Sequence, residues 1–501
     1  MKTISKDALL VASRQELIEV ILQQTNELQE IRFKLEWFQR QVFGAKSERF
    51  VSEDDLQTML DLGIVAPQQQ PVKTEEVSYQ RRVSTTATEK PKGHGRGTMP
   101  THLPIDEEVI QPEGDLTGLI RIGEDISWYY DMQPGSLRVK KIIRPRYARP
   151  DGDGVVIGKL PPLPIDKGNA GPGLMTQVTI DKHVYHLPLD RQRKKFKNEY
   201  DVDFSESWLC DIVKNTAFWL KPVYDVYIER LLKATYLQAD ETPIPVLVKD
   251  KKGKTHRGYF WVYFDPLGKI VIFDYRESRS SSGPMAFLKD FKGTLQVDGY
   301  DGYNPVEARP DITRAGCMDH VRRRFEKALD YDRPRAVYAM DAMRPWYELE
   351  TAAKREGLSL EDRFTQRIAT TVPAMKEFGT WLKAQVPEIL PKSPMGNAIS
   401  YALNQWPYFE PFMTDSRIEL SNILIENQNR PVAIGRKNYM FCGSHPAAQR
   451  AAMIYSLVSI AKLHGLDPFV YIKELLTKLP ASTNKQVDQF LLPECKPAEK
   501  K

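Results

Sequence analysis

Three acidic residues, far apart in the chain, have the type and setting needed to bind divalent metal ions. They are Asp240 in "YLQADETPIPVL", Asp298 in "TLQVDGYDGY" and Glu426 in "RIELSNILIENQNRP". Carboxylate oxygens suit Mg²⁺, and three such side chains could hold two ions about 3.5–4 Å apart for the in-line transfer of a phosphoryl group. Each residue alone also has an ordinary interpretation, because Asp is common before turns and Glu on an exposed helix is usually solvated.

Both aspartates are expected where a strand ends. Alternation in "TYLQAD" makes Asp240 emerge at the end of a strand, directly before a turn made by Pro243 and Pro245. Asp298 caps the strand of "GTLQVDGY", and the glycines that follow let the backbone turn tightly. Glu241 is expected to shape the turn or to support the site, although its role and that of Asp240 could be reversed.

The third acid is expected on a late helix, around Ile418–Asn429. At helical spacing, Glu419, Asn422, Glu426 and Asn429 form a polar stripe, and the apolar residues between them would anchor the helix. Glu426 could therefore face the two aspartates. An acid at the first strand, one at the fourth and one on a late helix is the arrangement of the ribonuclease-H-like fold.

The pattern around these residues predicts an α/β fold with a mixed sheet covered by helices. Three β-rich stretches, "ATYLQAD", "GYFWVYFD" and "KIVIFDY", precede a helix expected from about Pro284 to Phe291 and a further strand, "GTLQVDGY". Residues 319–403 read as charged helices, and more helices follow up to about residue 478. The tail from Ala481 is expected to be poorly ordered.

The chain before the sheet should contain several smaller units. Apolar residues from Leu17 to Phe38 alternate steps of four and three, which predicts a coiled-coil helix that either self-associates or packs on the protein's own body. Ser205 could cap a helix in a helical region with helix-turn-helix spacing, although many helical hairpins look the same. The expected division is 1–64, a leucine-zipper-like helix and basic segment; 65–100, a flexible linker; 101–168, short strands forming a small β-rich module; 169–233, a helical DNA-binding region; 234–445, the domain of the acids, with a helical insertion at about 333–405; and 446–501, C-terminal helices and tail.

Basic side chains crowd several segments, and those beside the acids could bind phosphate. Solvated surface charge is the ordinary interpretation of any one of them, and His320, which precedes the run of arginines in "HVRRRFEKA", could equally be structural. The residues predicted to contact DNA are Lys46, Arg49, Arg144, Arg146, Arg193, Lys194, Arg322, Arg323, Arg324, Arg430, Arg436 and Lys437.

Composition excludes several classes of protein. The 501 residues carry 71 Lys and Arg against 66 Asp and Glu, so the net charge of +5 is too small to identify a partner. The four cysteines form no CxxC or CxC pair, which argues against a disulfide framework and a cysteine zinc site. Neither a signal peptide nor an apolar run of membrane-spanning length is visible, and we expect a soluble cytoplasmic protein.

Several longer motifs resemble segments of the insertion-sequence-66 family of transposases. In order they are "FQRQVFGAKSERF", "LQADETPIPV", "LQVDGYDGYN", "GCMDHVRRRFEKA", "RPVAIGRKNYMFCGS" and "AAMIYSLVSIAKLHGLDPFVYIKELLTKLP". The resemblance implies a ribonuclease-H-like catalytic domain in which Asp240, Asp298 and Glu426 are the catalytic acids and the ligands of Mg²⁺, or of Mn²⁺ in its place. It also implies double-stranded DNA as partner and at least a dimer on DNA, with accessory proteins of the same element as further candidates.

The chain departs from the family pattern in two places. Paired cysteines usual in the family's zinc module are missing around "EGDLTGLIRIGED" and "RYARPDGDG", so zinc is not expected. The residues around Glu426 also differ from the usual pattern. Three functions therefore stay open: a transposase that binds terminal inverted repeats and catalyses strand cleavage and transfer, a DNA-binding protein that has lost catalysis, and a ribonuclease-H-like nuclease with another substrate.

Overall fold

The computed structural model describes residues 102–114, 117, 120–133, 135–149, 155–165, 168–248 and 254–492. The chain divides into two compact units, Met1–Gly93 and His94–Lys501, and every described residue belongs to the second. Several predictions concern residues outside the described part. They are the coiled-coil helix, the linker, and the DNA contacts of Lys46 and Arg49, and the last nine residues also lie outside it.

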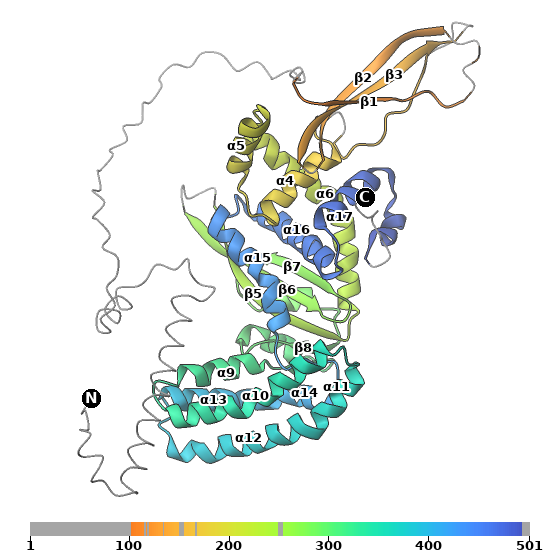
Figure 1. The fold of residues 1–501 in the computed structure, drawn as a ribbon. Helices are drawn as coiled ribbons and strands as arrows, with labels where there is room; N and C mark the ends of the chain where they lie inside the picture. Colours follow the sequence, from red (N-terminus) through yellow and green to blue (C-terminus); the bar gives the residue numbers. More distant parts are fainter. Residues whose placement is uncertain are drawn as a thin grey trace, which may run out of the picture. The chain divides into compact units, whose positions relative to one another are not determined.

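A small sheet begins the described chain and contains a long hairpin (Figure 1). Strands β2 (Ile120–Gln133) and β3 (Ser136–Ala148) are antiparallel, and β1 (Ile105–Val109) and β4 (Val155–Ile157) both pair with β3. The residues of the expected β-rich module form strands, and the main ones are 14 and 13 residues long rather than short. Buried and partly exposed side chains alternate only over the first four residues of β3, and buried positions then recur every third residue, at Ile142 and Pro145.

Three helices follow, namely α4 (Pro172–His183), α5 (Leu189–Tyr200) and α6 (Glu206–Leu232). The backbone N–H of Trp208 donates to the Ser205 hydroxyl, so Ser205 is the predicted N-cap of α6. The buried side of α6 packs against α4 and against a late helix, which ties this region to the main sheet.

The main sheet is mixed, as predicted, and has five strands in the order β7-β6-β5-β8-β9. Pairing is antiparallel between β5, β6 and β7 and parallel between β5, β8 and β9. The strands are β5 (Tyr236–Leu247), β6 (Thr255–Asp265), β7 (Ile270–Arg276), β8 (Gly293–Gln296) and β9 (Ile312–Ala315). Most of β7 and the second half of β6 are buried, and helix α16 (His445–Leu463) packs against β7.

Helices surround this sheet and form a separate layer after β9 (Figure 1). The layer holds the predicted insertion, whose buried aromatic and aliphatic side chains form their own core. The helices are α7 (Ser282–Phe287), α8 (Asn304–Glu307), α9 (Met318–Lys327), α10 (Arg333–Arg355), α11 (Leu360–Gln366), α12 (Val372–Gln385), α13 (Pro394–Gln405), α14 (Glu410–Thr414), α15 (Ile423–Tyr439), α16 (His445–Leu463) and α17 (Pro468–Lys478).

The turn predicted at Pro243 and Pro245 is wrong, because β5 runs straight through both prolines to Leu247. The carbonyl oxygens of Pro243 and Pro245 accept hydrogen bonds from Arg436 and from the backbone N–H of Cys442, so both residues face away from β6. On that side β8 pairs only with the first three residues of β5, and the missing proline N–H groups therefore cost no ladder hydrogen bond.

Three other predicted boundaries also shift. The helix of Glu426 begins at Ile423 and ends at Tyr439, the helix predicted at Pro284–Phe291 is Ser282–Phe287, and the tail is ordered as far as Leu492. The last difference arises because apolar residues of the tail are buried, and the Leu492 N–H donates to the Tyr227 hydroxyl at 2.7 Å.

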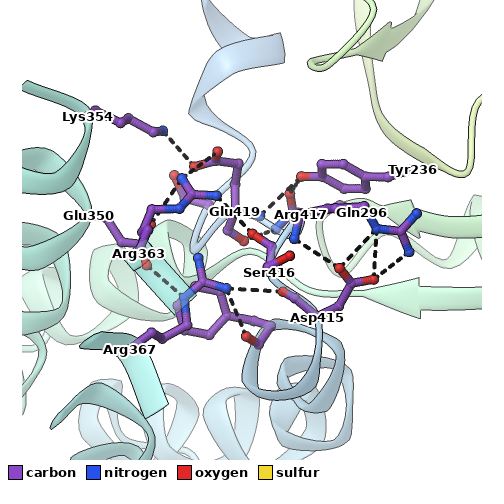
Figure 2. A network of polar contacts seen from close by, with 12 residues as sticks. Tyr236, Gln296, Glu350, Lys354, Arg363, Arg367, Asp415, Ser416, Arg417 and Glu419 are labelled. Atoms are coloured by element: carbon purple, nitrogen blue, oxygen red, sulfur yellow. Dashed lines mark hydrogen bonds and ion pairs between the residues drawn. The ribbon is translucent and has the colours of Figure 1, made fainter. Parts of the chain in front are cut away.

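A buried network of charges joins the helical layer to the segment that precedes α15 (Figure 2). Arg367 is fully buried, and it donates to Glu350 Oε1 at 2.8 Å and to the carbonyl oxygen of Asp415 at 3.1 Å. Arg363 lies 3.3 Å from Glu350 Oε2 and donates to Glu419 Oε1 at 3.0 Å. Each charge is thus compensated inside the layer, which is the condition for burying it.

Removing one member of this network should destabilise the helical layer. We expect Glu350→Ala to lower the free energy of unfolding by about 3 kcal/mol, because the substitution leaves the buried Arg367 guanidinium without its carboxylate. Scanning calorimetry should show this as a lower melting temperature. The matched control is Glu348→Ala, an exposed position on the same helix, with an effect within about 0.5 kcal/mol. Equal melting temperatures for the two variants would contradict the assigned role of the network.

Candidate active site

The two aspartates leave the sheet at equivalent positions of neighbouring strands. Gln238 of β5 and Gln296 of β8 are directly opposite in the parallel pair, and Asp240 and Asp298 each follow two residues later. Asp240 is within β5 rather than at its end, whereas Asp298 comes after β8 has ended. Glu426 lies in the first turn of α15, the helix that packs against β5.

Two neighbouring residues, Asn429 and His320, lie between the three acids. Asn429, one helical turn after Glu426, donates its amide N–H to Asp240 Oδ2 at 2.7 Å. His320 of α9 lies between the other two, with its Nε2 atom 4.0 Å from Asp298 Oδ2 and 4.0 Å from Glu426 Oε1. The structure therefore brings together the three acids that the sequence predicted.

Two buried amides hold the chain that leads into α15, and we call Gln238 and Gln296 the glutamine clamp. Gln238 Nε2 donates to Gln296 Oε1 at 2.9 Å and to the carbonyl oxygen of Ser421 at 3.3 Å. Gln296 Nε2 donates to the carbonyl oxygen of Glu419 at 2.7 Å, and Gln238 Oε1 accepts from the N–H of Ile425 at 3.3 Å. The clamp thus fixes α15, and with it the third acid, against the strands of the first two.

The sequence predicts a helix that begins at about Ile418, and this is wrong for Ile418–Asn422. These residues are not helical, because the contacts with the glutamine clamp hold their backbone in another path. Glu419 does not join a polar stripe with Glu426. Its carboxylate accepts from Lys354 at 2.6 Å and from Arg363 at 3.0 Å, while its N–H donates to the Tyr236 hydroxyl (Figure 2). Glu419 is therefore a structural residue of the connection between the sheet and the helical layer.

The acids experience one another's charge. Burial is the main cause that raises the pKa of Asp240 to about 8, and the charges of Glu241, Asp298 and Glu426 act in the same direction. Burial and then the charge of Arg323 lower the pKa of His320, although Asp298 and Glu426 act in the opposite direction. Asp240 is thus held near other acids and has no cationic partner in the described part of the chain, an arrangement that favours binding of a positive ion.

The nearest cations already serve other acids. Arg323 of α9 donates to Glu426 Oε1 at 2.6 Å. Arg279 forms an ion pair with Glu241, whose second oxygen accepts from the Tyr303 hydroxyl at 3.2 Å. Glu241 therefore joins β5 to the segments that carry Arg279 and Tyr303, and its predicted part in a turn is wrong.

The chemistry of the acids suits Mg²⁺, but their spacing in this conformation does not yet form a closed set of ligands. Within the described part of the chain, no three His, Cys, Asp or Glu side chains stand close enough together to hold one ion. Two observations still fit a cation at the acids. No described Lys, Arg or His pairs with Asp240, and the Oδ1 atom of Asn429 beside it is buried without a hydrogen bond to described residues.

The predicted basic residues fall into two groups. Around the acids, Arg322 and Arg324 lie over the rings of Tyr347 and Tyr401, and Arg430 and Lys437 are exposed on α15. Arg436 is used internally, because it donates to the Thr242 hydroxyl and to the carbonyl oxygen of Pro243. Arg323, bound to Glu426, is the predicted basic residue in direct contact with an acid of the site.

The second group of predicted basic residues precedes the main sheet in the chain, and most of its described members form ion pairs with acidic side chains. Arg146 pairs with Asp125, while Arg193 and Lys194 both pair with Asp190. Arg144 donates to the carbonyl oxygen of Gly158 at 3.2 Å. Contacts of these residues with DNA stay predictions, since the structure contains only this chain.

Sequence reasoning missed the glutamine clamp and Asn429 as an orienting residue, and one signal could have found the clamp. The dipeptide "LQ" comes two residues before Asp240 in "LQAD" and again before Asp298 in "LQVD". A polar residue repeated inside two otherwise apolar strands predicts a buried amide pair. In contrast, the link between Asn429 and Asp240 spans 189 residues and has no local signal.

Among the helices that the structure describes, none combines the length and the hydropathy required to cross a membrane.

Comparisons with known proteins agree over nearly the whole chain. Residues 167–450 match the model described as "Transposase IS66 family", residues 30–107 match "Transposase C of IS166 homeodomain", and residues 456–493 match "IS66 C-terminal element".

Three relatives come from Sinorhizobium fredii (strain NBRC 101917 / NGR234). "Uncharacterized protein y4jD" is 30% identical over 485 residues, which are 93% of this chain and 94% of that protein. "Uncharacterized protein y4hP" is 28% identical over 90% of this chain and 85% of its own length, and "Uncharacterized protein y4qI" is 30% identical over 92% and 87%. Because the family model covers more than half of the chain and includes all three acids, the chain belongs to the IS66 family of transposases.

Proposed function

We propose that this chain is a DNA transposase that binds the terminal inverted repeats of its element and cuts and joins DNA at Asp240, Asp298 and Glu426. The observation that carries the proposal is the meeting of these acids, which come from β5, the segment after β8 and α15. His320 stands within 4.0 Å of two of them, and Asn429 of α15 binds the third.

The sheet supports a ribonuclease-H-like catalytic domain. Asp240 is on its first strand in chain order, Asp298 follows its fourth, and Glu426 is on a helix that comes after an inserted helical layer. This is the arrangement expected from the sequence. In this proposal, the main sheet, α9 and α15 form the catalytic part of the chain.

In this proposal the three acids hold Mg²⁺, or Mn²⁺ in its place. When bound, the ions supply activation of water or a 3′-hydroxyl and stabilisation of the leaving oxygen. The N–H of Glu241 and the amide of Asn429 orient the Asp240 carboxylate through hydrogen bonds of 2.8 and 2.7 Å. Arg323, which binds Glu426 in this conformation, would then turn to a backbone phosphate.

Double-stranded DNA is the partner in this proposal, and the described surface offers exposed cations for it on both sides of the acids. Two DNA ends must be brought together for transposition, so we propose that the chain acts as a homo-oligomer on DNA. Accessory proteins of the same element are further candidate partners. A DNA-binding protein without catalysis remains the second candidate, because Glu426 is already occupied by Arg323.

Neutralising any of the three acids should abolish chemistry while DNA binding persists. We expect Asp240→Asn, Asp298→Asn and Glu426→Gln each to lower cleavage of DNA carrying the element ends by at least about 10³-fold. Gel electrophoresis of cleaved and joined products measures catalysis, and gel retardation measures binding. The control is Asp301→Asn, an exposed aspartate three residues after Asp298, which should keep full activity.

The pattern of these results separates the candidate functions. Cleavage without strand joining would favour a nuclease with another substrate. Binding by all variants and cleavage by none, the wild type included, would replace the transposase with a DNA-binding protein. Full activity of any one acid variant would remove that acid from the site.

Metal binding should stabilise the folded protein through the same acids. We expect Mn²⁺ to raise the melting temperature of the wild type in a concentration-dependent way, because an ion that binds only the folded state adds RT ln(1 + [Mn²⁺]/Kd) to stability. The rise should be lost in Asp240→Asn and Asp298→Asn and kept in Asp301→Asn. EDTA should reverse it. An identical rise in all four proteins would place the ion elsewhere.

A further inference from the structure

A small cavity lies where α4, α6 and the start of α16 meet, and none of the three acids lines it. Its volume is about 70 Å³, and we call it the α4–α16 pocket. Lys182 of α4, Cys210 of α6 and Arg450 of α16 line it, together with Phe441 and Cys442 from the connection between α15 and α16. The space exceeds that of a single water molecule, so a group of several atoms can enter.

Two basic side chains line the pocket, and no described carboxylate lines it with them. Neither the Lys182 ammonium nor the Arg450 guanidinium forms a hydrogen bond or an ion pair with another residue in the described part of the chain. Burial lowers the pKa of Lys182, so the cavity disfavours its charge until an anion compensates it, although the charge of Glu206 acts in the opposite direction. Burial raises the pKa of the Cys210 and Cys442 thiols, so these do not supply that anion.

Partly buried cations that lack partners are uncommon, because desolvation is costly unless an anion compensates it. The start of α16 adds to this preference. Gly443 and Ala447 also line the pocket, next to the first turn of the 19-residue helix, where the helix dipole favours negative charge. Two cations without a hydrogen bond or ion pair to described residues thus line one cavity beside this helix N-terminus, where the Ala447 N–H already donates to the Ser444 hydroxyl and the helix contributes its dipole.

The position of the pocket connects it to the proposed active site. The Cys442 N–H donates to the carbonyl oxygen of Pro245 at 2.8 Å, and the Leu247 N–H donates to that of Cys442 at 2.8 Å. The pocket wall is therefore bound to the strand that carries Asp240. Met440 and Phe441, which follow α15 directly, are 63% and 37% exposed and offer an apolar surface to a sugar or base beside the pocket.

We propose that the α4–α16 pocket binds a phosphate group of the DNA backbone through Lys182 and Arg450. This inference rests on the proposed function and extends it, since neither residue is among the basic residues predicted from the sequence. It assigns α4 and α16 a direct contact with the DNA strand that β5 and α15 present to the acids.

The test compares wild type with Lys182→Met and Arg450→Gln in binding of end-containing DNA over a range of salt concentrations. Each phosphate contact contributes about one unit to the slope of log affinity against log salt, so each variant should lose about one unit. Lys182→Met removes no hydrogen bond within the described chain, and its melting temperature should be unchanged or higher. The control is Lys221→Met on α6, whose exposed ammonium pairs with Asp225 at 2.5 Å, and its slope should not change.

A second readout is the rate at which acetic anhydride modifies Lys182, followed by mass spectrometry with DNA or with inorganic phosphate present. Protection by DNA, together with the loss of slope, supports the inference. Protection by inorganic phosphate alone would make the pocket a site for a free anion and overturn the inference. If the wild type binds DNA but both variants keep its salt slope and DNA does not protect Lys182 from labelling, the inference is overturned and the proposed function is left intact. If the wild type binds no DNA, both are overturned.

Discussion

The mutual hydrogen bonding of two buried amides is the interaction on which the candidate site depends. Gln238 and Gln296 lie opposite each other in the parallel pair of β5 and β8, and both also form hydrogen bonds with the backbone that leads into α15. Their other partners are the Tyr236 hydroxyl and the carbonyl oxygen of Gly316. Buried amides are costly unless every donor and acceptor is used. Any other register of these strands, or any other path of the segment at 419–425, would leave these groups unpaired. The geometry of the acids is therefore a consequence of satisfying the amides.

Charge is distributed in this protein according to burial. In the helical layer, Arg363 and Arg367 are buried and bound to Glu350, so they act as structural cross-links. At the surface, the acids of β1 and α5 neutralise much of the basic hairpin and the basic helix before the main sheet. The density of Lys and Arg in a sequence is consequently a poor guide to where an anion can bind. The unpartnered cations identify such places better, and these can be found only once the pairs are known.

The sequence was informative wherever function and fold depend on local pattern. Alternation predicted the strands of the mixed sheet, Ser205 was predicted correctly as an N-cap, and the longer motifs identified the family. Prediction failed where a distant contact overrides local preference. Two closely spaced prolines usually mark a turn. Here no described strand pairs with Pro243 and Pro245 on the side of their missing N–H groups, and β5 continues through them. Glu419 has helical neighbours in sequence, but it is pulled out of the helix by Arg363, 56 residues earlier.

The same prolines have a consequence for how the protein behaves among other copies of itself. Beyond Gln238, β8 no longer covers β5, and a strand with a free side can recruit a foreign strand through its unpaired N–H groups. Pro243 and Pro245 remove two of those donors on the uncovered side, and Cys442 occupies the groups on either side of Val246. The strand that carries Asp240 is thereby a poor template for intermolecular pairing. Helix α15, rather than another strand, can therefore pack against β5 on this side, and the sheet does not become prone to aggregation.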